Sequence, residues 1–326
     1  MSSDEARNLK LRALYSFHVD GAWDDFDVRQ RRWSRFVDQQ VENFCSASGR
    51  KDSELDVMCI QGAWGMNAGV GSSCLSAAGS GACTSRCMPR CAMPCSRSGT
   101  RANCCMFPAF LCAIMCGGLC GGCCCTCRHS QRAYLRDVSR LPHVTSPPSN
   151  ADLPRRSRVA CCSSSGLSDS GLCVLSSAPP EEVTFVKFEP VMARGEDVVR
   201  KGALVCRWGN VVVINAHLSR DAEAREAQMA RVRDMVPKLC RKHEGAEVHI
   251  CISAKLSRED ATMQTSLDRL KMDSDMRPAM SSSETTADGR ECDYIITSSH
   301  GRQTDSTIVR TDLSRHALLC ASFNAE

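Results

Sequence analysis

Aromatic residues are scarce in this sequence of 326 residues, where Phe, Trp and Tyr together make up 5%. Hydrophobic residues of all kinds make up 43%, so the chain can bury a core. That core must rest on Val, Leu, Ile, Met and Cys rather than on large rings. The length suits one large α/β domain or two small ones.

A secretory signal is also not visible, because the sequence opens MSSDEARNLK, which is polar and charged, and we expect none. The sequence nevertheless contains 24 cysteines, of which 14 lie between Cys74 and Cys127. Disulfide frameworks belong mainly to exported proteins. We therefore expect an intracellular protein whose cysteines are metal ligands, sites of lipid attachment or reduced thiols.

Acidic residues are nearly absent from residues 66–166, a segment that we call the insertion. It contains 11 Arg and two acids, Asp137 and Asp152, so its net charge is +9 while the rest of the chain carries −5 of the total of +4. A basic field of this size attracts phosphates, an anionic membrane surface or an acidic protein. A solvated and partly disordered insertion would have the same composition.

Hydrophobic periodicity outside the insertion predicts an alternation of strands and a few helices. We expect strands at residues 9–19, 55–60, 183–188, 203–208, 211–218, 248–252, 293–296 and 318–323, a turn leading into a strand at 168–176, and helices at 29–44 and 221–242. A strand-rich chain with few helices is typical of a layered α/β sandwich.

Short motifs on these elements occur in a characteristic order. They read LYSF at 14–17, IQG at 60–62, SGL at 170–172, KGAL at 201–204, NAHL at 215–218, SAKL at 253–256, DYI at 293–295 and SRH at 314–316. A helix carrying Arg225 and Gln228 follows the fifth motif. In order and spacing the set resembles the endonuclease/exonuclease/phosphatase superfamily, and KGAL is similar to an element of its neutral sphingomyelinases.

The resemblance implies a four-layer α/β sandwich, in which two mixed β-sheets pack face to face and are flanked by helices. It covers residues 9–65 and 168–323. We therefore predict a single domain over residues 1–326, with the insertion at 66–166 placed inside it.

The resemblance also implies a chemistry. The family hydrolyses phosphodiesters with a hard divalent cation, usually Mg²⁺, held by oxygen ligands. A histidine oriented by an aspartate deprotonates the attacking water. By their motifs, His217, His316 and Asp293 stand at catalytic positions of this kind, as remnants that we expect to be insufficient alone.

Five other family positions are altered. Gly62 replaces the metal-binding Glu, and Ser16 replaces an Asn. Ala254 and Leu256 replace an Asp and an Asn, and Arg315 replaces another Asp. We therefore expect a degenerate site that holds no metal or cofactor, and a chain that is not an enzyme.

Lys255 and Arg315 add positive charge to the same motifs. The former phosphate pocket would then be cationic without a metal, and it would hold a phosphate or a phospholipid headgroup without cleaving it. The alternative is that these side chains only fill the old cleft and pair with nearby acids.

The insertion allows three interpretations. Residues 104–127 carry no charge and are flanked by Arg residues, which favours peripheral membrane attachment by S-acylation. The candidate acylation sites are Cys104, Cys105, Cys112, Cys116, Cys120, Cys123, Cys124, Cys125 and Cys127. Zinc binding is a second interpretation, although cysteines at 83, 87, 91 and 95 lack the usual paired spacing. A low-complexity segment is the third.

The leading functional hypothesis is a pseudoenzyme that acts as a binding or scaffold module, on a membrane or within a larger protein assembly. The alternative is an active Mg²⁺-dependent phosphodiesterase acting on sphingomyelin or another phospholipid. A second alternative is nucleic-acid binding through the Arg-rich insertion. It is less favoured because Phe107, Phe110 and Tyr134 are the insertion's only aromatic residues for base stacking.

Overall fold

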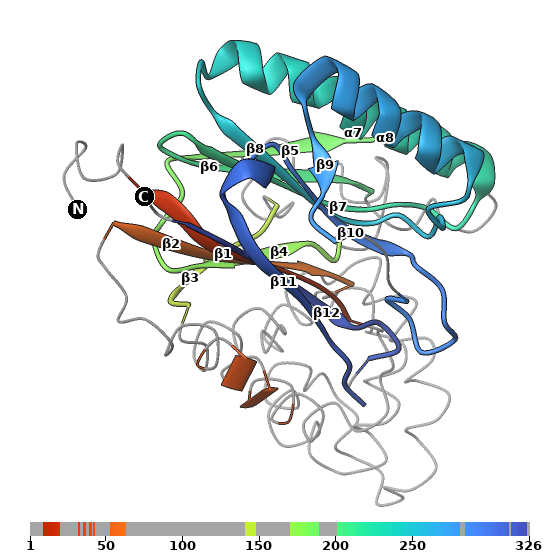
Figure 1. The fold of residues 1–326 in the computed structure, drawn as a ribbon, viewed down its shortest axis with the longest axis horizontal. Coiled ribbons are helices and arrows are strands. Elements are labelled where there is room, and N and C mark those ends of the chain that lie inside the picture. The colour runs from red at the N-terminus through yellow and green to blue at the C-terminus, as the bar shows by residue number, and fades with distance from the viewer. Residues whose placement is uncertain are drawn as a thin grey trace, which may run out of the picture.

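The computed structural model describes residues 9–19, 53–62, 141–147, 170–188, 201–280, 284–312 and 314–324, with isolated positions between 32 and 42. These residues form two six-stranded mixed sheets that pack against each other, with two helices on the outer side of one sheet (Figure 1). The predicted α/β sandwich of two mixed sheets is thereby confirmed. The helices expected on the other outer side fall outside the described residues, apart from the isolated positions.

The first sheet has the strand order β11-β12-β1-β2-β4-β3. Its strands are β1 (Lys10–His18), β2 (Glu54–Gln61), β3 (His143–Thr145), β4 (Cys173–Ser176), β11 (Gln303–Val309) and β12 (Leu318–Phe323). β1 and β2 are parallel, and the other pairs are antiparallel. β3 lies within the insertion and adds an edge strand to this sheet.

The second sheet has the strand order β5-β6-β7-β8-β10-β9. Its strands are β5 (Glu182–Lys187), β6 (Gly202–Trp208), β7 (Val211–His217), β8 (Glu247–Ser253), β9 (Arg277–Pro278) and β10 (Asp293–Thr297). Only β7 and β8 run parallel, joined by the helix α7 (Ala222–Lys242). The helix α8 (Ala261–Ser274) lies beside α7 on the same face (Figure 1).

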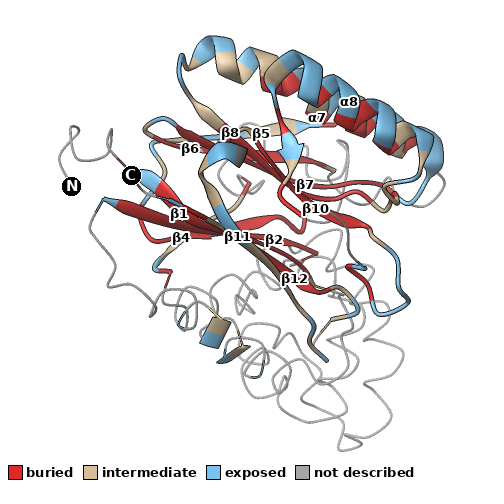
Figure 2. Ribbon diagram, viewed as in Figure 1, coloured by how far each residue is buried: buried red, intermediate tan, exposed pale blue. Residues whose placement is uncertain are grey.

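Strand β7 is buried on both faces, which explains its uninterrupted apolar run. Val211 and Val213 belong to the core between the two sheets. Val212 and Ile214 belong to the core beneath the helices. Successive side chains of a strand alternate between faces, so Asn215 and His217 share the inter-sheet side with Val211. Figure 2 shows this concentration of buried residues in the central strands.

Both helices begin at an aspartate. The side chain of Asp221 accepts a hydrogen bond from the Ala224 amide at 3.0 Å, and that of Asp260 accepts one from the Thr262 amide at 2.9 Å. Such caps satisfy amides that the first helical turn leaves open. Neither described helix has the length and apolarity that crossing a membrane requires.

The predicted helix at 29–44 is described only in part. The described positions between 32 and 42 are helical. The ring of Phe36 lies 6.0 Å from that of Phe17, so this segment contacts the first sheet. The described cysteines are all free thiols, namely Cys59, Cys173, Cys206, Cys240, Cys251, Cys292 and Cys320, and all but Cys240 are buried.

Candidate functional site

Three histidines meet where strands of the two sheets end. His18 is the last residue of β1, His217 is the last residue of β7, and Asp293 is the first residue of the antiparallel β10. His316 precedes β12 and forms an isolated bridge with Thr286. We call His18, His217, His316 and Asp293 together the histidine cluster.

His316 and Asp293 form a hydrogen-bonded pair, with 2.6 Å between His316 Nδ1 and Asp293 Oδ2. The carboxylate is buried, and the amide of Asp293 donates to Thr285 Oγ1 at 3.1 Å. The hydroxyl of Ser314 donates to the His18 carbonyl at 2.7 Å and accepts from the His316 amide at 3.0 Å. With a proton on Nδ1 facing the carboxylate, the lone pair of the His316 ring lies on Nε2.

His18 is the member of the histidine cluster that the motifs did not identify. Its ring centroid lies 3.9 Å from that of His316 and 4.5 Å from that of His217, so it lies in contact with both. His18 Nδ1 is 3.0 Å from Ser253 Oγ, at the end of β8. A signal for His18 was present, since strand alternation puts it on the same face of β1 as Ser16.

Burial dominates the electrostatics of the cluster. It lowers the pKa of His18 well below its ordinary value, and the nearby His316, Lys255, Lys201 and Arg220 lower it further. Burial likewise lowers the pKa of His217, followed by the effects of His18 and the two lysines. Desolvation disfavours the charged imidazolium, so both rings are neutral at pH 7.

A polar layer beneath the cluster joins the two sheets. Gln61 Nε2 donates to Ser16 Oγ at 3.2 Å and to Asn215 Oδ1 at 2.8 Å. Asn215 Nδ2 donates to the carbonyls of Ile60 at 3.1 Å and Cys173 at 2.9 Å. Ser16, one of the altered family positions, therefore has a structural partner in Gln61.

The space beside Gly62 is closed. Gly62 has φ +77°, and a Cβ built on it would lie 2.3 Å from the Val19 carbonyl oxygen and 3.0 Å from Cδ2 of His18. Real Cβ atoms do not approach a backbone oxygen so closely, so this backbone excludes a glutamate side chain at position 62.

The residues present do not fit Mg²⁺, which takes mainly carboxylate, carbonyl and water oxygens. Within the described residues, the one group able to hold a metal ion consists of His18, Asp293 and His316, and it offers a single carboxylate. Ala254 and Leu256 are buried in the core beneath the helices.

The two predicted anion-binding residues have different surroundings. Lys255 is half-buried at a left-handed backbone position, φ 55°, and its charge acts on His18 and His217. Arg315 is exposed, and its carbonyl accepts from the Ala287 amide at 2.7 Å. The candidate acylation sites, from Cys104 to Cys127, and the cysteines of the zinc alternative lie outside the described residues.

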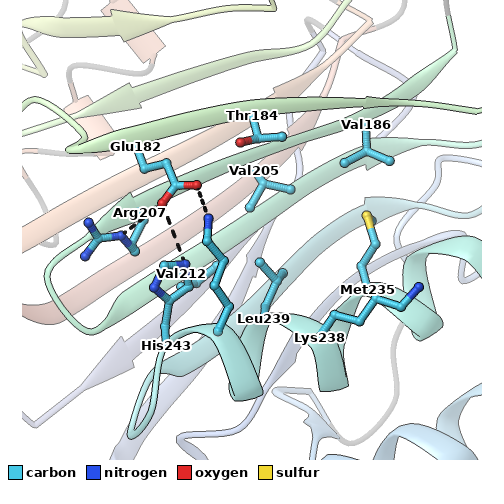
Figure 3. Close-up of a pocket in the computed structure, with 11 residues that line it drawn as sticks. Glu182, Thr184, Val186, Val205, Arg207, Val212, Met235, Lys238, Leu239 and His243 are labelled. Carbon is cyan, nitrogen blue, oxygen red and sulfur yellow. Dashed lines mark hydrogen bonds and ion pairs between the residues drawn. The ribbon is translucent and has the colours of Figure 1, made fainter.

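A surface pocket lies on the other side of the second sheet (Figure 3). Val205 and Val212 line it from the sheet, and Leu239 lines it from α7. At its rim Glu182 pairs with Lys242. Because Val212 faces the helices and His217 faces the first sheet, this pocket is separate from the histidine cluster.

Several solved structures have a similar fold. Beta toxin from Staphylococcus aureus is 15% identical and matches with a TM-score of 0.54, over 96% of this chain and 100% of its own. Sphingomyelinase C from Streptomyces griseocarneus is 14% identical, with a TM-score of 0.50 over 96% of this chain and 99% of its own. TDP2 from Caenorhabditis elegans is 12% identical, with a TM-score of 0.52 over 99% of this chain and 76% of its own.

No family model and no curated protein sequence matches the chain. At these identities the structural likeness establishes the fold alone. The chain has the endonuclease/exonuclease/phosphatase fold, as its motifs predicted.

Proposed function

We propose that this protein is a non-catalytic binding or scaffold module built on the sphingomyelinase-like phosphodiesterase fold. The observation that carries the proposal is the packing at Gly62. A hydrolase of this kind needs a carboxylate there to hold Mg²⁺, and here Val19 and the ring of His18 take the space.

The surrounding residues support the same conclusion. Ala254 and Leu256 contribute to a hydrophobic core rather than to a polar cleft. Asp293 is thus the one carboxylate in the histidine cluster, and one carboxylate is a poor site for a hard cation. Without the metal, nothing offsets the charge that develops on the phosphoryl oxygens during hydrolysis.

The binding half of the proposal rests on charge. Lys255 and Lys201 both act on His18, so the cluster lies in a positive field. A phosphate or a phospholipid headgroup is the ligand that such a field attracts. The insertion also carries a net charge of +9, and we propose it as the segment that contacts an anionic membrane surface or a protein assembly.

An active phosphodiesterase is the second candidate. The 2.6 Å hydrogen bond between His316 and Asp293 favours it, because an Asp-oriented histidine is the arrangement of a general base. Turnover would then need a cation held by ligands other than a side chain at position 62.

Hydrolysis assays separate the two candidates. The purified chain is incubated with Mg²⁺ or Mn²⁺ and sphingomyelin, phosphoinositides or nucleic acid. We expect no turnover above background, and the same background from His316→Ala and from the control His243→Ala, which lies at the end of α7. Turnover that His316→Ala abolishes and His243→Ala retains would refute the proposal.

A separate experiment addresses partners. Sedimentation with anionic and neutral vesicles is compared for the full chain and for a variant lacking residues 74–138, which keeps β3. We expect anionic vesicles to retain the full chain and release the variant. Equal retention would remove the insertion from the proposal, and RNA binding lost with the same deletion would favour the nucleic-acid alternative.

A further inference from the structure

The surface pocket outside the second sheet is lined by rows of side chains that run across its strands. Glu182 of β5 lies opposite Arg207 of β6 in one row, and Thr184 lies opposite Val205 in the next. All four residues line the pocket. Residues two apart in a strand point to the same face, so both rows face α7. The pocket therefore has a charged row at one end.

The charges at this end are balanced. Glu182 forms an ion pair with Lys242 of α7, and Figure 3 shows this pair joining the helix to the sheet. Arg207 Nε lies 3.6 Å from Glu182 Oε2, and Arg207 Nη2 lies 2.8 Å from Glu181 Oε2. Burial, followed by the effects of Arg207 and Lys242, lowers the pKa of the adjacent His243, so its ring is neutral at pH 7. Two carboxylates therefore offset two cations.

Beyond the charged row the pocket is apolar. Val186 and Val205 line it from the sheet, and Met235 and Leu239 line it from α7. Figure 3 shows Met235 and Leu239 pointing from the helix toward the strands. The pocket has a volume of about 150 Å³. An apolar cavity of about this size takes up benzene, so roughly six carbon atoms of a ligand would fit.

Lys238 adds a positive charge that is not offset. It lines the pocket from α7, and Figure 3 shows it beside Met235, away from Glu182. Its side chain is exposed, and no acidic side chain pairs with it among the residues that the structure describes. Asp234, one helical turn earlier, pairs with Arg233 at 2.9 Å instead. An apolar pocket thus lies next to a single uncompensated cation.

We propose that this pocket binds a single-chain anionic amphiphile, a medium-chain carboxylate such as octanoate. The carboxylate pairs with the ammonium group of Lys238, and the chain lies between Val205 and Leu239. The charge of Lys238 disfavours an amphiphile with a cationic head. Room for roughly six carbon atoms is too little for the two long chains of a membrane phospholipid.

This inference goes beyond the proposed function and does not depend on it. The pocket lies on the helix side of the second sheet, whereas His217 of the histidine cluster faces the first sheet. A carboxylate bound in the pocket contacts none of the groups that a hydrolase would use. It would give the chain a ligand site separate from the one proposed for a phosphate or a headgroup.

The test is isothermal titration calorimetry of the full chain with octanoate at pH 7, below the concentration at which octanoate forms micelles. We expect one bound octanoate per chain. Hexanoate, which is shorter by two methylenes, should bind about tenfold more weakly, because each buried methylene contributes about fourfold. The uncharged 1-octanol should bind about two- to fivefold more weakly than octanoate, as expected for the loss of an exposed ion pair.

Three variants locate the site. Lys238→Gln should weaken octanoate about two- to fivefold and leave 1-octanol unchanged. Thr184→Phe puts a ring into the pocket from an exposed strand position that tolerates aromatic residues, and it should weaken octanoate at least about tenfold. Arg231→Gln is the matched control, because Arg231 is an exposed cation of α7 that does not line the pocket. It should bind octanoate as the unmodified chain does.

Unchanged octanoate binding in Lys238→Gln or in Thr184→Phe would overturn the proposal, as would a complete lack of binding. Self-association of the chain that Thr184→Phe abolishes would assign the pocket to a second copy and would equally overturn it. If Thr184→Phe does not fold by circular dichroism, the exposed Lys238 still decides the outcome. A failure here is distinct from failure of the proposed function, because none of these measurements depends on turnover.

Discussion

Replacing Gly62 by alanine tests the closed site directly. The residue has φ +77°, where a side chain costs about 1–2 kcal/mol. The new Cβ would also lie 2.3 Å from the Val19 carbonyl oxygen, more than 1 Å short of the about 3.5 Å of ordinary contact. Relieving such overpacking costs about 1–3 kcal/mol more, so we expect Gly62→Ala to lower the free energy of unfolding by about 2–5 kcal/mol.

Gly245→Ala provides the matched control. Gly245 has φ +72°, but a Cβ there would meet nothing within 4 Å. It should therefore lose only the about 1–2 kcal/mol of backbone strain. Urea unfolding of both variants, followed by circular dichroism, measures the difference. Equal losses would show that Val19 and His18 do not close the space beside Gly62, so packing would not exclude a carboxylate at that position.

Three further predictions concern stability. Asn215→Ala leaves two buried strand carbonyls without their donor and should cost about 2–4 kcal/mol in urea unfolding; a loss below about 1 kcal/mol would mean that the polar layer does not join the sheets. Burial, with a smaller effect of Arg302, lowers the pKa of His249 from 6.5 to about 3. As the pH falls, the unfolded chain therefore takes up the proton before the folded chain does. The free energy of unfolding contributed above about pH 6.5 is lost as the pH falls toward 3. In His249→Gln, the free energy of unfolding measured across this pH range should change less with pH. Arg12→Met leaves the buried Asp56, now bonded at 2.9 and 2.6 Å, without its partner and should cost about 3–5 kcal/mol, whereas Arg12→Met with Asp56→Leu should recover much of the loss; a double variant as unstable as the single one would contradict this.

Much of the fold could be predicted because the hydrophobic pattern of most strands is visible in the sequence. β7 is buried along its whole length and reads as an unbroken strand, and the helix after it shows clear periodicity. α8 was not predicted, because Ser266 interrupts its buried stripe of Met263, Leu267 and Leu270. The structure resolves the conflict, since the Ser266 hydroxyl donates to the Thr262 carbonyl within its own helix at 2.8 Å.

The residues of the candidate site could be predicted from the sequence where they belong to one of the motifs. His316 and Asp293 could be paired through the resemblance, and the structure brings them together. His18 could not be found in this way, because it follows the first motif and belongs to none. The glycine at position 62, where the resemblance implies a carboxylate, was visible in the sequence. That a histidine ring and a carbonyl fill the space depends on packing across strands, which local patterns do not encode.

The buried thiols offer a way to detect separation of the two sheets by chemical labelling. Cys59, Cys206 and Cys251 come from β2, β6 and β8, strands of both sheets, and all three belong to the core between the sheets. Burial raises the pKa of the Cys59 and Cys206 thiols, so their reactive thiolate forms are withheld while the sheets stay together. The rate at which a maleimide labels these thiols in native buffer therefore measures how often the two sheets separate. A ligand that binds to residues of both sheets would lower this labelling rate. Its binding could then be detected without an assay of activity.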